Sequence, residues 1–462
     1  MSEVAFMSGL SERVSSNVKG RVIGPLDVGY DEARQVFSGA IDRRPALIVR
    51  AADAGDVQRV VALARETGTE LAVRSGGHSA AGHSTTDGGI VLDLRDLKTI
   101  ELNVDGRTVW AETGLTAIEL SKAVGEFGLV IGFGDTGSVG IGGITLGGGS
   151  GYLLRAFGLT IDSLLAADIV TADGELLRVD ARHHPDLFWA IRGGGGNFGV
   201  ATRFHYRLET LPEIFGGMLM LPATPETVAK FIGLSEAAPD RLTTIANIMN
   251  CPPMPFVPAE HHGKIVVFGL LCYAGPTDEG ERALAPFRAL ATPIVDMLKP
   301  MPYHEIYPPE DPSYRPKADA LTMFIDRVDA SVAAVIDQYL RASDASMRAV
   351  QLRVQGGAMA RVPVDATAYA HRKSRIMANV ASFFDGSEDR PRRKQWVDEL
   401  AGALRGPDRG AYVGFMGDEG PERVRAAYPG ATWDRLAAIK ARYDPTNLFR
   451  LNQNVPPAST RP

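Results

Sequence analysis

Arg74-Ser75-Gly76-Gly77-His78-Ser79 is the stretch that decides how this chain is organised, together with the glycine-rich stretch at 137–149. Each follows an apolar, strand-like run and offers a row of backbone N–H groups with few side chains in the way. Glycine lets the main chain approach an anion closely and adopt φ > 0 without strain. Successive N–H groups that turn inward form a concave phosphate site. The two stretches therefore predict two loops that hold the phosphates of one dinucleotide, with His78 where an imidazole reaches the cofactor ring.

The composition is that of an ordinary globular protein. At 462 residues the chain exceeds the roughly 250–300 residues that one core usually supports, so we expect two structural domains. A net charge of -6 and a pI near 5.9 argue against a nucleic-acid-binding protein, which would carry a basic domain. No apolar stretch reaches the ~18 residues of a membrane-spanning helix. Residues 1–25 lack the apolar core of a secretory signal.

Cysteine is scarce and glycine abundant. Cys251 and Cys272 are too few for a disulfide scaffold, and we expect two buried thiols, from which a cytoplasmic location follows. The 50 glycines concentrate at 137–151 and 193–199, between apolar flanks. A backbone that cradles a cofactor explains this better than disorder does. The histidines show no metal-binding spacing, so no metal is predicted.

The hydrophobic pattern changes near residue 211. Before it, residues 45–77 predict a strand, a helix that starts at Asp53 and a strand leading to the His78 loop, and residues 165–179 predict a hairpin. After it, longer strands alternate with helices. The expected strands are 217–221, 242–249, 264–273, 349–356, 374–384 and 411–416, and the expected helices are 225–237, 278–290, 331–342, 392–404 and 422–442. This pattern predicts an α+β fold with a cofactor domain at 1–211, an inserted α+β substrate domain at 212–420, and a segment at 421–462 that returns to the first domain.

Seven motifs in this order resemble those of the berberine-bridge-enzyme-like FAD-linked oxidases, in the superfamily of vanillyl-alcohol oxidase. The matching stretches are 74–79, 82–83, 137–151, Tyr152, 158–162, 193–200 and 443–454, and the resemblance runs from about residue 40 to the C-terminus. It implies FAD, a two-part FAD-binding domain of the PCMH type at about 41–211, and a second domain whose antiparallel sheet roofs the flavin. It also implies oxidation by hydride transfer to the flavin, with dioxygen as the reoxidant.

The resemblance implies that FAD is bound by residues of these motifs. They are Arg74, Ser75, Gly76, Gly77, His78, Ser79, His83, Gly137, Ser138, Gly140, Gly142, Gly143, Gly147, Gly148, Tyr152, Gly158, Asp162, Asn197, Gly199, Val200, Asn452 and Asn454. His78 would carry the 8α-methyl carbon of the flavin covalently; the alternative is a loop histidine that only hydrogen-bonds. Thr136 stands where doubly linked members have a cysteine, so a single covalent link and a less open substrate cavity are predicted.

Two of these motifs have competing interpretations. Gly194, Gly196 and Gly199 satisfy a G-x-G-x-x-G string, but a helical pattern precedes it and a strand-like one follows, the reverse of a nicotinamide-binding loop. A tight turn against the flavin is the better interpretation. Asn452 and Asn454 end an apolar tail and could be an ordinary C-terminal turn, whereas the resemblance assigns them to the cofactor.

The substrate side rests on two segments. Gln351, Arg353 and Gln355 share one face of a predicted strand, which is either a solvated face or the wall of the cavity. In the second case Arg353 favours a carboxylate, phenolate or enolate substrate. Tyr412 is the candidate base or the group that orients a substrate hydroxyl, unless it is a packing aromatic. Gly414 stands where many members have asparagine, and residues 356–364 contain no acid to match the catalytic glutamate of berberine bridge enzyme.

These features predict an FAD-dependent oxidase. We expect Tyr412, Arg353 and Gln351 to form the catalytic group, and the substrate to be a small organic molecule with an alcohol, phenol or amine next to the oxidised C–H. The partners are then this substrate and dioxygen. Two alternatives remain open: a flavin dehydrogenase that uses another electron acceptor, and a redox-silent flavin-binding protein.

Overall fold

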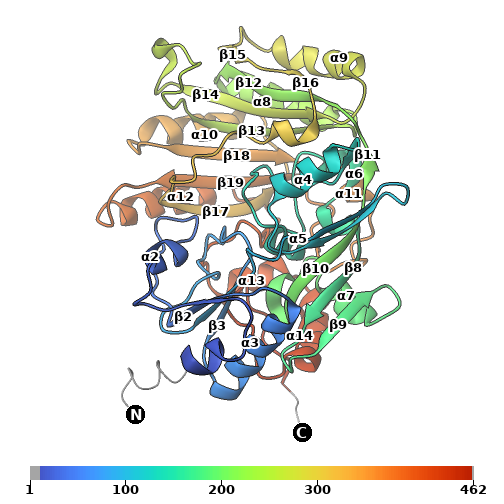
Figure 1. Cartoon of the computed structure of the whole chain (residues 1–462). Coiled ribbons are helices and arrows are strands. Elements are labelled where there is room, and N and C mark those ends of the chain that lie inside the picture. The colour runs from blue at the N-terminus through green and yellow to red at the C-terminus, as the bar shows by residue number, and fades with distance from the viewer. Residues whose placement is uncertain (1–10, 460–462) are drawn as a thin grey trace.

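The computed structural model describes residues 11–459, so the prediction about a secretory signal in residues 1–25 lies partly outside the described residues. Figure 1 shows two halves stacked on each other. The lower half contains β2, β3, β8, β9 and β10, and the upper half contains the long strands from β12 to β19. The fold is α+β, as predicted. None of the helices in the described part of the chain is long and apolar enough to cross a membrane.

A four-stranded mixed sheet carries the His78 loop. Its strand order is β1 (Arg21–Ile23), β2 (Leu47–Arg50), β4 (Ile90–Asp93), β3 (Leu71–Arg74), and β4 lies parallel to both of its neighbours. Helix α3 (Ala54–Thr67) connects β2 to β3; Asp53 caps it by accepting the Asp56 N–H, and Gly68 ends it with φ 66°. Its buried Val57 and Val61 pack on the sheet, so the strand, helix and strand predicted here are confirmed. The short α2 (Tyr30–Ala33) precedes them.

A five-stranded antiparallel sheet forms the rest of the lower half. Its order is β5 (Ile100–Asn103), β6 (Thr108–Glu112), β10 (Val200–Arg207), β8 (Leu164–Val170), β9 (Leu176–Asp180), and β8 and β9 are the predicted hairpin. Helix α4 (Ala117–Gly125) starts with a capping box between Thr116 and Glu119. The other elements of this half are β7 (Leu129–Val130), α5 (Ile141–Gly147), α6 (Leu154–Phe157), η1 (Thr160–Asp162), α7 (Pro185–Ala190), η2 (Gly195–Phe198) and β11 (Glu209–Thr210).

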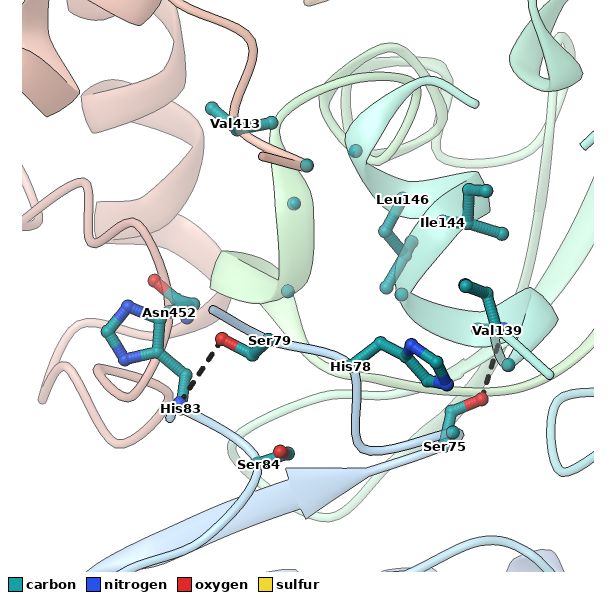
Figure 2. Close-up of a pocket in the computed structure, with 18 of the residues that line it drawn as sticks. Ser75, His78, Ser79, His83, Ser84, Val139, Ile144, Leu146, Val413 and Asn452 are labelled. Atoms are coloured by element: carbon teal, nitrogen blue, oxygen red, sulfur yellow. Dashed lines mark hydrogen bonds between the residues drawn. The ribbon is translucent and has the colours of Figure 1, made fainter. Parts of the chain in front are cut away.

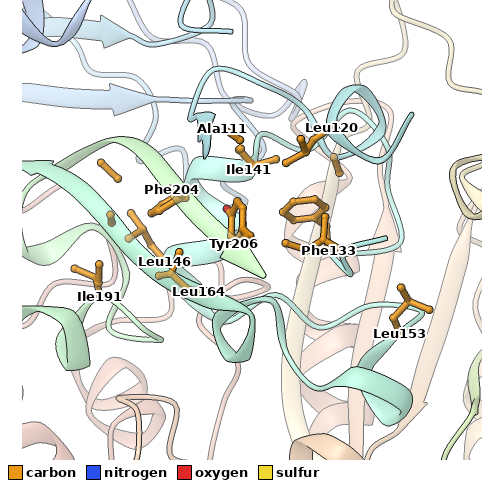
Figure 3. Close-up of a cluster of buried hydrophobic side chains, with 14 of the residues drawn as sticks. Ala111, Leu120, Phe133, Ile141, Leu146, Leu153, Leu164, Ile191, Phe204 and Tyr206 are labelled. Atoms are coloured by element: carbon orange, nitrogen blue, oxygen red, sulfur yellow. The ribbon is translucent and has the colours of Figure 1, made fainter. Parts of the chain in front are cut away.

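The core beneath α5 fixes that helix on the five-stranded sheet. Figure 3 shows Ile141 and Phe133 next to Tyr206 of β10. The Phe133 and Tyr206 rings meet edge to face with centroids 6.0 Å apart. The buried Tyr206 hydroxyl is 2.7 Å from the Thr145 hydroxyl, so its polar end is also satisfied. The glycine-rich stretch at 137–149 is therefore a short helix with one face in the core, and not a loop throughout.

An antiparallel sheet forms the upper half. Its order is β15 (Val295–Asp296), β12 (Ile214–Pro222), β14 (Ile265–Tyr273), β13 (Leu242–Asn250), β18 (Arg348–Val354), β19 (Ile376–Phe383), β17 (Ala318–Ile325), with β16 (Lys299–Met301) beside β12. The helices α8 (Pro225–Ala237), α9 (Thr277–Arg288), α10 (Ala330–Ala342) and α12 (Arg390–Leu404) share a core with its strands. Leu352 and Val354 belong to that core, so strand alternation turns Gln351 and Arg353 toward the other face.

The C-terminal segment packs back on the lower half. Helices α13 (Pro421–Ala427) and α14 (Ala431–Tyr443) are followed by an irregular stretch whose Leu448 and Phe449 join the core of the mixed sheet. The fully buried Asp444 organises that turn, because it pairs with Lys440 at 2.6 Å and accepts the N–H groups of Leu448 and Phe449. Burial lowers the pKa of Lys440, and Asp444 opposes that shift.

Three details of the predicted elements were wrong. Residues 411–416 are irregular and not a strand, because they turn beneath the sheet and do not extend along it. The helical tail expected at 422–442 is two helices separated at Tyr428 and Gly430. Strand β17, together with the short β15 and β16, was not predicted. The remaining short elements are η3 (Ala259–His261), η4 (Tyr303–Ile306) and α11 (Ala358–Arg361).

Candidate active site

A cavity of about 430 Å³ lies where the two predicted phosphate loops, the turn at 195–200 and the irregular segment 412–416 meet. Figure 2 shows His78 beside the start of α5, His83 and Asn452 at the other side, and Val413 above. The sequence-predicted residues that line it are Ser75, Gly76, Gly77, His78, Ser79, His83, Gly140, Gly142, Gly143, Gly147, Gly199, Val200, Tyr412 and Asn452. The structure thus brings together residues that are far apart in the sequence.

The floor of the cavity is main chain. The two loops cross so closely that a Cβ atom on Gly140 would lie 2.2 Å from the Gly76 nitrogen, and one on Gly76 would lie 2.2 Å from the Gly140 nitrogen. Ser75 ties the crossing together, since its hydroxyl donates to the Thr113 carbonyl at 2.6 Å and accepts the Gly142 N–H at 3.3 Å. A Cβ on Gly143 would meet no atom within 4 Å, so that side of α5 faces open space.

Several polar groups on the lining have no partner in the protein. Within residues 11–459 the unpartnered buried atoms on this lining are His83 Nε2, Ser84 Oγ, Ser150 Oγ, Tyr428 Oη and Asn452 Oδ1. A buried polar atom without a hydrogen bond costs about 1–3 kcal/mol. A ligand with many polar atoms would satisfy them, and glycine-lined walls admit its phosphates and rings. The residues present therefore fit FAD.

His78 is held at one end of the cavity by contacts on both its face and its edge. The Phe37 ring stacks on it at 4.3 Å with an interplanar angle of 19°. Its Nε2 is 3.0 Å from Ser138 Oγ. Burial lowers the pKa of His78 to about 4, while the nearby Glu310 carboxylate opposes that shift. The imidazole is therefore neutral at neutral pH and keeps a lone pair on one nitrogen.

Four side chains form another part of the cavity wall. We call Asp135, Arg353, Tyr412 and Phe415 the roof cluster. Arg353 forms an ion pair with Asp135 and donates to the Ser150 carbonyl at 3.1 Å. Its guanidinium lies over the Phe415 ring, 4.7 Å from the centroid, and Phe415 meets Tyr412 edge to face at 5.2 Å. Asp135, Tyr412 and Phe415 line the cavity, whereas Arg353 lies behind them.

Tyr412 has a defined hydrogen-bonding role. Its hydroxyl oxygen accepts the Gly149 N–H at 3.0 Å, which leaves its own proton free to be donated. Burial raises the pKa of Tyr412, although the Gly149 N–H and the Arg353 charge oppose the rise. A Cβ on Gly414 would lie 2.7 Å from the Tyr412 ring. The ring thus occupies the space that an asparagine at 414 would need.

Other sequence-predicted residues lie outside the lining, in supporting positions. Arg74 pairs with Asp93 at 2.9 Å below the His78 loop. Asp162 accepts two hydrogen bonds from Arg372, at 2.7 and 2.8 Å. Gln351 lies behind the roof cluster, where it accepts the Arg353 Nε hydrogen bond at 2.9 Å.

The remaining predicted residues stand next to the lining. Asn197 donates to the Gln453 carbonyl at 3.1 Å and accepts the Val455 N–H at 2.8 Å, which joins the turn at 195–200 to the C-terminal stretch. Tyr152 packs under Asp135, with its hydroxyl 3.4 Å from that carbonyl. Four others flank lining residues: Gly137, Ser138, Gly148 and Asn454. Gly158 does not, and it lies beside Asp162.

Sequence reasoning missed four residues of the site. Asp135 stands next to Thr136 in the sequence, but no pattern there assigns it a role. Phe37 and Glu310 come from segments without any motif, and Glu310 lies in a proline-rich stretch. Phe415 was seen only as part of a strand. Among residues 11–459, no three His, Cys, Asp or Glu side chains gather as a metal site would require.

Comparisons with known proteins agree with this geometry. Residues 45–180 match the family profile "FAD binding domain", and residues 411–456 match "Berberine and berberine like". The chain is 32% identical to (R)-6-hydroxynicotine oxidase of Paenarthrobacter nicotinovorans over 460 residues, which covers 96% of this chain and 97% of that protein.

Solved structures show the same fold. The crystal structure of 6-hydroxy-D-nicotine oxidase from Arthrobacter nicotinovorans superposes with a TM-score of 0.83 at 28% identity, covering 95% of this chain and 98% of that one. Chitooligosaccharide oxidase superposes with a TM-score of 0.84 at 19% identity, covering 97% and 100%, a likeness of fold. The predicted combination of a PCMH-type FAD-binding part with an antiparallel sheet is confirmed. The chain belongs to the berberine bridge enzyme-like family of FAD-linked oxidoreductases and is an FAD-dependent enzyme that oxidises small organic molecules.

Proposed function

We propose that this enzyme is an oxidase that removes hydride from a C–H next to an alcohol, phenol or amine, and that dioxygen takes up the electrons. The observation that carries the proposal is one cavity whose lining includes both the neutral His78 imidazole and Tyr412, whose hydroxyl proton is free to be donated. When bound, FAD supplies the two-electron oxidation. The similarity to 6-hydroxynicotine oxidase supports an oxidase of a small heterocyclic or amine-bearing molecule.

The cofactor would be held by main chain on the floor and by polar side chains at the far side. Backbone groups of Gly76, Gly140 and Gly143 would face its phosphates and rings, and His83 and Asn452 would gain the partners they lack. We propose a single covalent link, at His78. Thr136 lines the cavity where doubly linked relatives carry cysteine, and it offers no thiol.

Both cysteines, Cys251 and Cys272, are free and buried elsewhere, which also supports the predicted cytoplasmic location.

The roof cluster would receive the substrate. Tyr412 is protonated at neutral pH, so its free O–H would donate to an oxygen or nitrogen of the substrate and orient the C–H. Arg353 already pairs with Asp135 and bonds to Ser150, so it offers no free charge to a carboxylate. We therefore favour a neutral or amine-bearing substrate over the anionic one that Arg353 suggested from sequence. Arg353 would act by positioning Asp135 and Phe415.

Acid precipitation of the purified protein tests the link. Flavin fluorescence that stays on the wild-type pellet and is lost in His78→Ala supports attachment at His78; release of all flavin from the wild type refutes it. A substrate panel read by peroxide formation then tests the oxidase. A flavin that a substrate reduces under argon but that air reoxidises slowly and a quinone dye rapidly would favour a dehydrogenase. A flavin that no substrate or dithionite bleaches would favour a binding protein.

A further inference from the structure

A hydrogen-bonded chain leads from His78 to a carboxylate on the surface. Ser138 Oγ is 3.0 Å from His78 Nε2 and also hydrogen-bonds to Glu310 Oε2. The Ser138 N–H donates to Glu310 Oε1 at 3.0 Å. One carboxylate thus holds both the N–H and the O–H of a serine that touches the proposed attachment residue. Glu310 is separated from Ser138 by 172 positions in the sequence, so no local motif predicts this contact.

The directions of these hydrogen bonds follow from the donors available. An ionised carboxylate only accepts, so Ser138 uses its single O–H to donate to Glu310. Its oxygen then accepts from His78, which places the imidazole proton on Nε2. The second ring nitrogen, Nδ1, is left with the lone pair. The hydrogen bond of one ring nitrogen thereby sets the tautomer and selects the other as the nucleophile.

The segment that carries Glu310 is fixed over His78 by other contacts. The Gly39 N–H donates to the Pro316 carbonyl at 2.9 Å, and a Cβ on Gly39 would lie 2.5 Å from the Arg315 carbonyl. Phe37, two residues before Gly39, stacks on the imidazole. The ring is therefore restrained on its face by Phe37 and on its edge by Ser138. Glu310 and Arg315 are charged side chains that act on it, with opposite signs.

We propose that Glu310, acting through Ser138, orients His78 for its attachment to FAD and receives the proton that the imidazole loses. The inference rests on the covalent link proposed above. The bond that forms joins His78 Nδ1 to the 8α-methyl carbon of FAD, and the bonds that break are one C–H of that methyl group and the Nε2–H. Dioxygen would accept the two electrons together with two protons and become hydrogen peroxide. Glu310 would hold the Nε2 proton first and then release it to solvent. Glu310 is a positioning residue, since it acts through Ser138.

The test measures attachment and not turnover. Full-length protein made in flavin-limited cells is given FAD, and acid-stable flavin fluorescence is followed with time from pH 6 to 9. We expect Glu310→Gln and Ser138→Ala to attach FAD about tenfold more slowly or worse at pH 7, since positioned proton transfer contributes about 10²–10⁴-fold. The Glu310→Gln rate should recover as the pH rises, because solvent base then takes the proton. Glu305→Gln, an exposed glutamate near the same segment, is the matched control and should behave as wild type.

Each other outcome overturns a defined part of the proposal. If Glu310→Gln attaches FAD at the wild-type rate at every pH, Glu310 has no role in attachment. The same conclusion follows if the slow variant has also lost non-covalent FAD binding or melts several degrees lower, because its defect would then be structural. Attachment through Nε2, read by NMR of the isolated flavin peptide, contradicts the assigned tautomer. A wild-type protein without acid-stable flavin would show that the covalent link does not form. That result is distinguishable from a failure of Glu310 and Ser138 to assist attachment.

Discussion

The floor and the roof of the cavity are built in different ways. The floor is main chain: Gly76 and Gly140 cross without room for a methyl group between them. The roof is side chain: Asp135, Arg353 and Phe415 come from three distant segments and hold each other by an ion pair and a cation–π contact. A backbone cradle tolerates little change in sequence, whereas a cluster of side chains can be exchanged one residue at a time. We therefore expect changes at the roof to alter which substrate is accepted while the floor keeps the cofactor.

The largest effect is expected where the two loops cross. Gly140→Ala places a methyl group 2.2 Å from the Gly76 nitrogen, which is backbone and cannot rotate away, and 2.2 Å from the Ser75 hydroxyl oxygen. We expect a loss of about 4 kcal/mol or more in the free energy of unfolding, or no folded protein. Denaturant unfolding of the purified variant measures it. A stable Gly140→Ala protein would show that the crossing is looser than the structure has it.

Gly143→Ala is the control that separates folding from cofactor binding. Its methyl group would meet no protein atom within 4 Å and would point into open space beside the cavity. We expect this variant to fold and to bind less FAD. Gly402→Ala, in the last turn of α12 with equally open surroundings, should change neither. Flavin content per folded protein distinguishes the three.

The next effect tests whether the roof depends on its ion pair. Arg353 is 4% exposed and Asp135 17%, so Arg353→Met leaves a largely buried carboxylate without its cation. We expect a loss of about 3 kcal/mol, and recovery of much of it in the double variant Arg353→Met/Asp135→Asn. Thermal and denaturant unfolding of the cycle measure the coupling. Additive losses would mean that the two residues act independently and that the roof cluster is not a unit.

The same contrast decides what the sequence could predict. That the floor residues lie together could be predicted from the sequence, because their conformation demands glycine at fixed spacing; Ser75, His78 and Gly140 all line one cavity. The roof could not be predicted in this way. Asp135 and Arg353 pair only because strand β18 lies against a turn that is distant in the sequence, and no local pattern encodes that arrangement. The segment at 411–416 was mistaken for a strand for a related reason: its apolar residues face a cavity rather than a neighbouring strand.

A smaller effect is expected at the hydroxyl that joins floor and roof. Tyr412→Phe removes the acceptor of the Gly149 N–H, a loss of about 1–2 kcal/mol in stability, and removes the proposed donor to the substrate. We expect kcat to fall by about 10²-fold with the FAD content unchanged. Tyr369→Phe is the matched control, since Tyr369 packs on Tyr412 and its hydroxyl has no hydrogen bond within residues 11–459. If Tyr412→Phe and Tyr369→Phe have the same kcat, Tyr412 contributes only packing.

The smallest effect concerns His371, a buried residue at the edge of the roof that does not touch the cavity. Its Nε2 donates to the Ala427 carbonyl at 2.9 Å, and burial lowers its pKa, with Asp408 opposing that shift and Arg423 adding to it. The unfolded chain therefore takes up a proton at a higher pH than the folded one, so stability is lost as the pH falls below about 6.5. His371→Gln keeps a donor and removes this proton uptake, so its melting temperature should fall less between pH 7 and pH 5 than that of the wild type. An equal fall in melting temperature in both proteins would place the acid sensitivity elsewhere. The cavity histidines His78 and His83 would be tested next, because burial lowers the pKa of each to about 4.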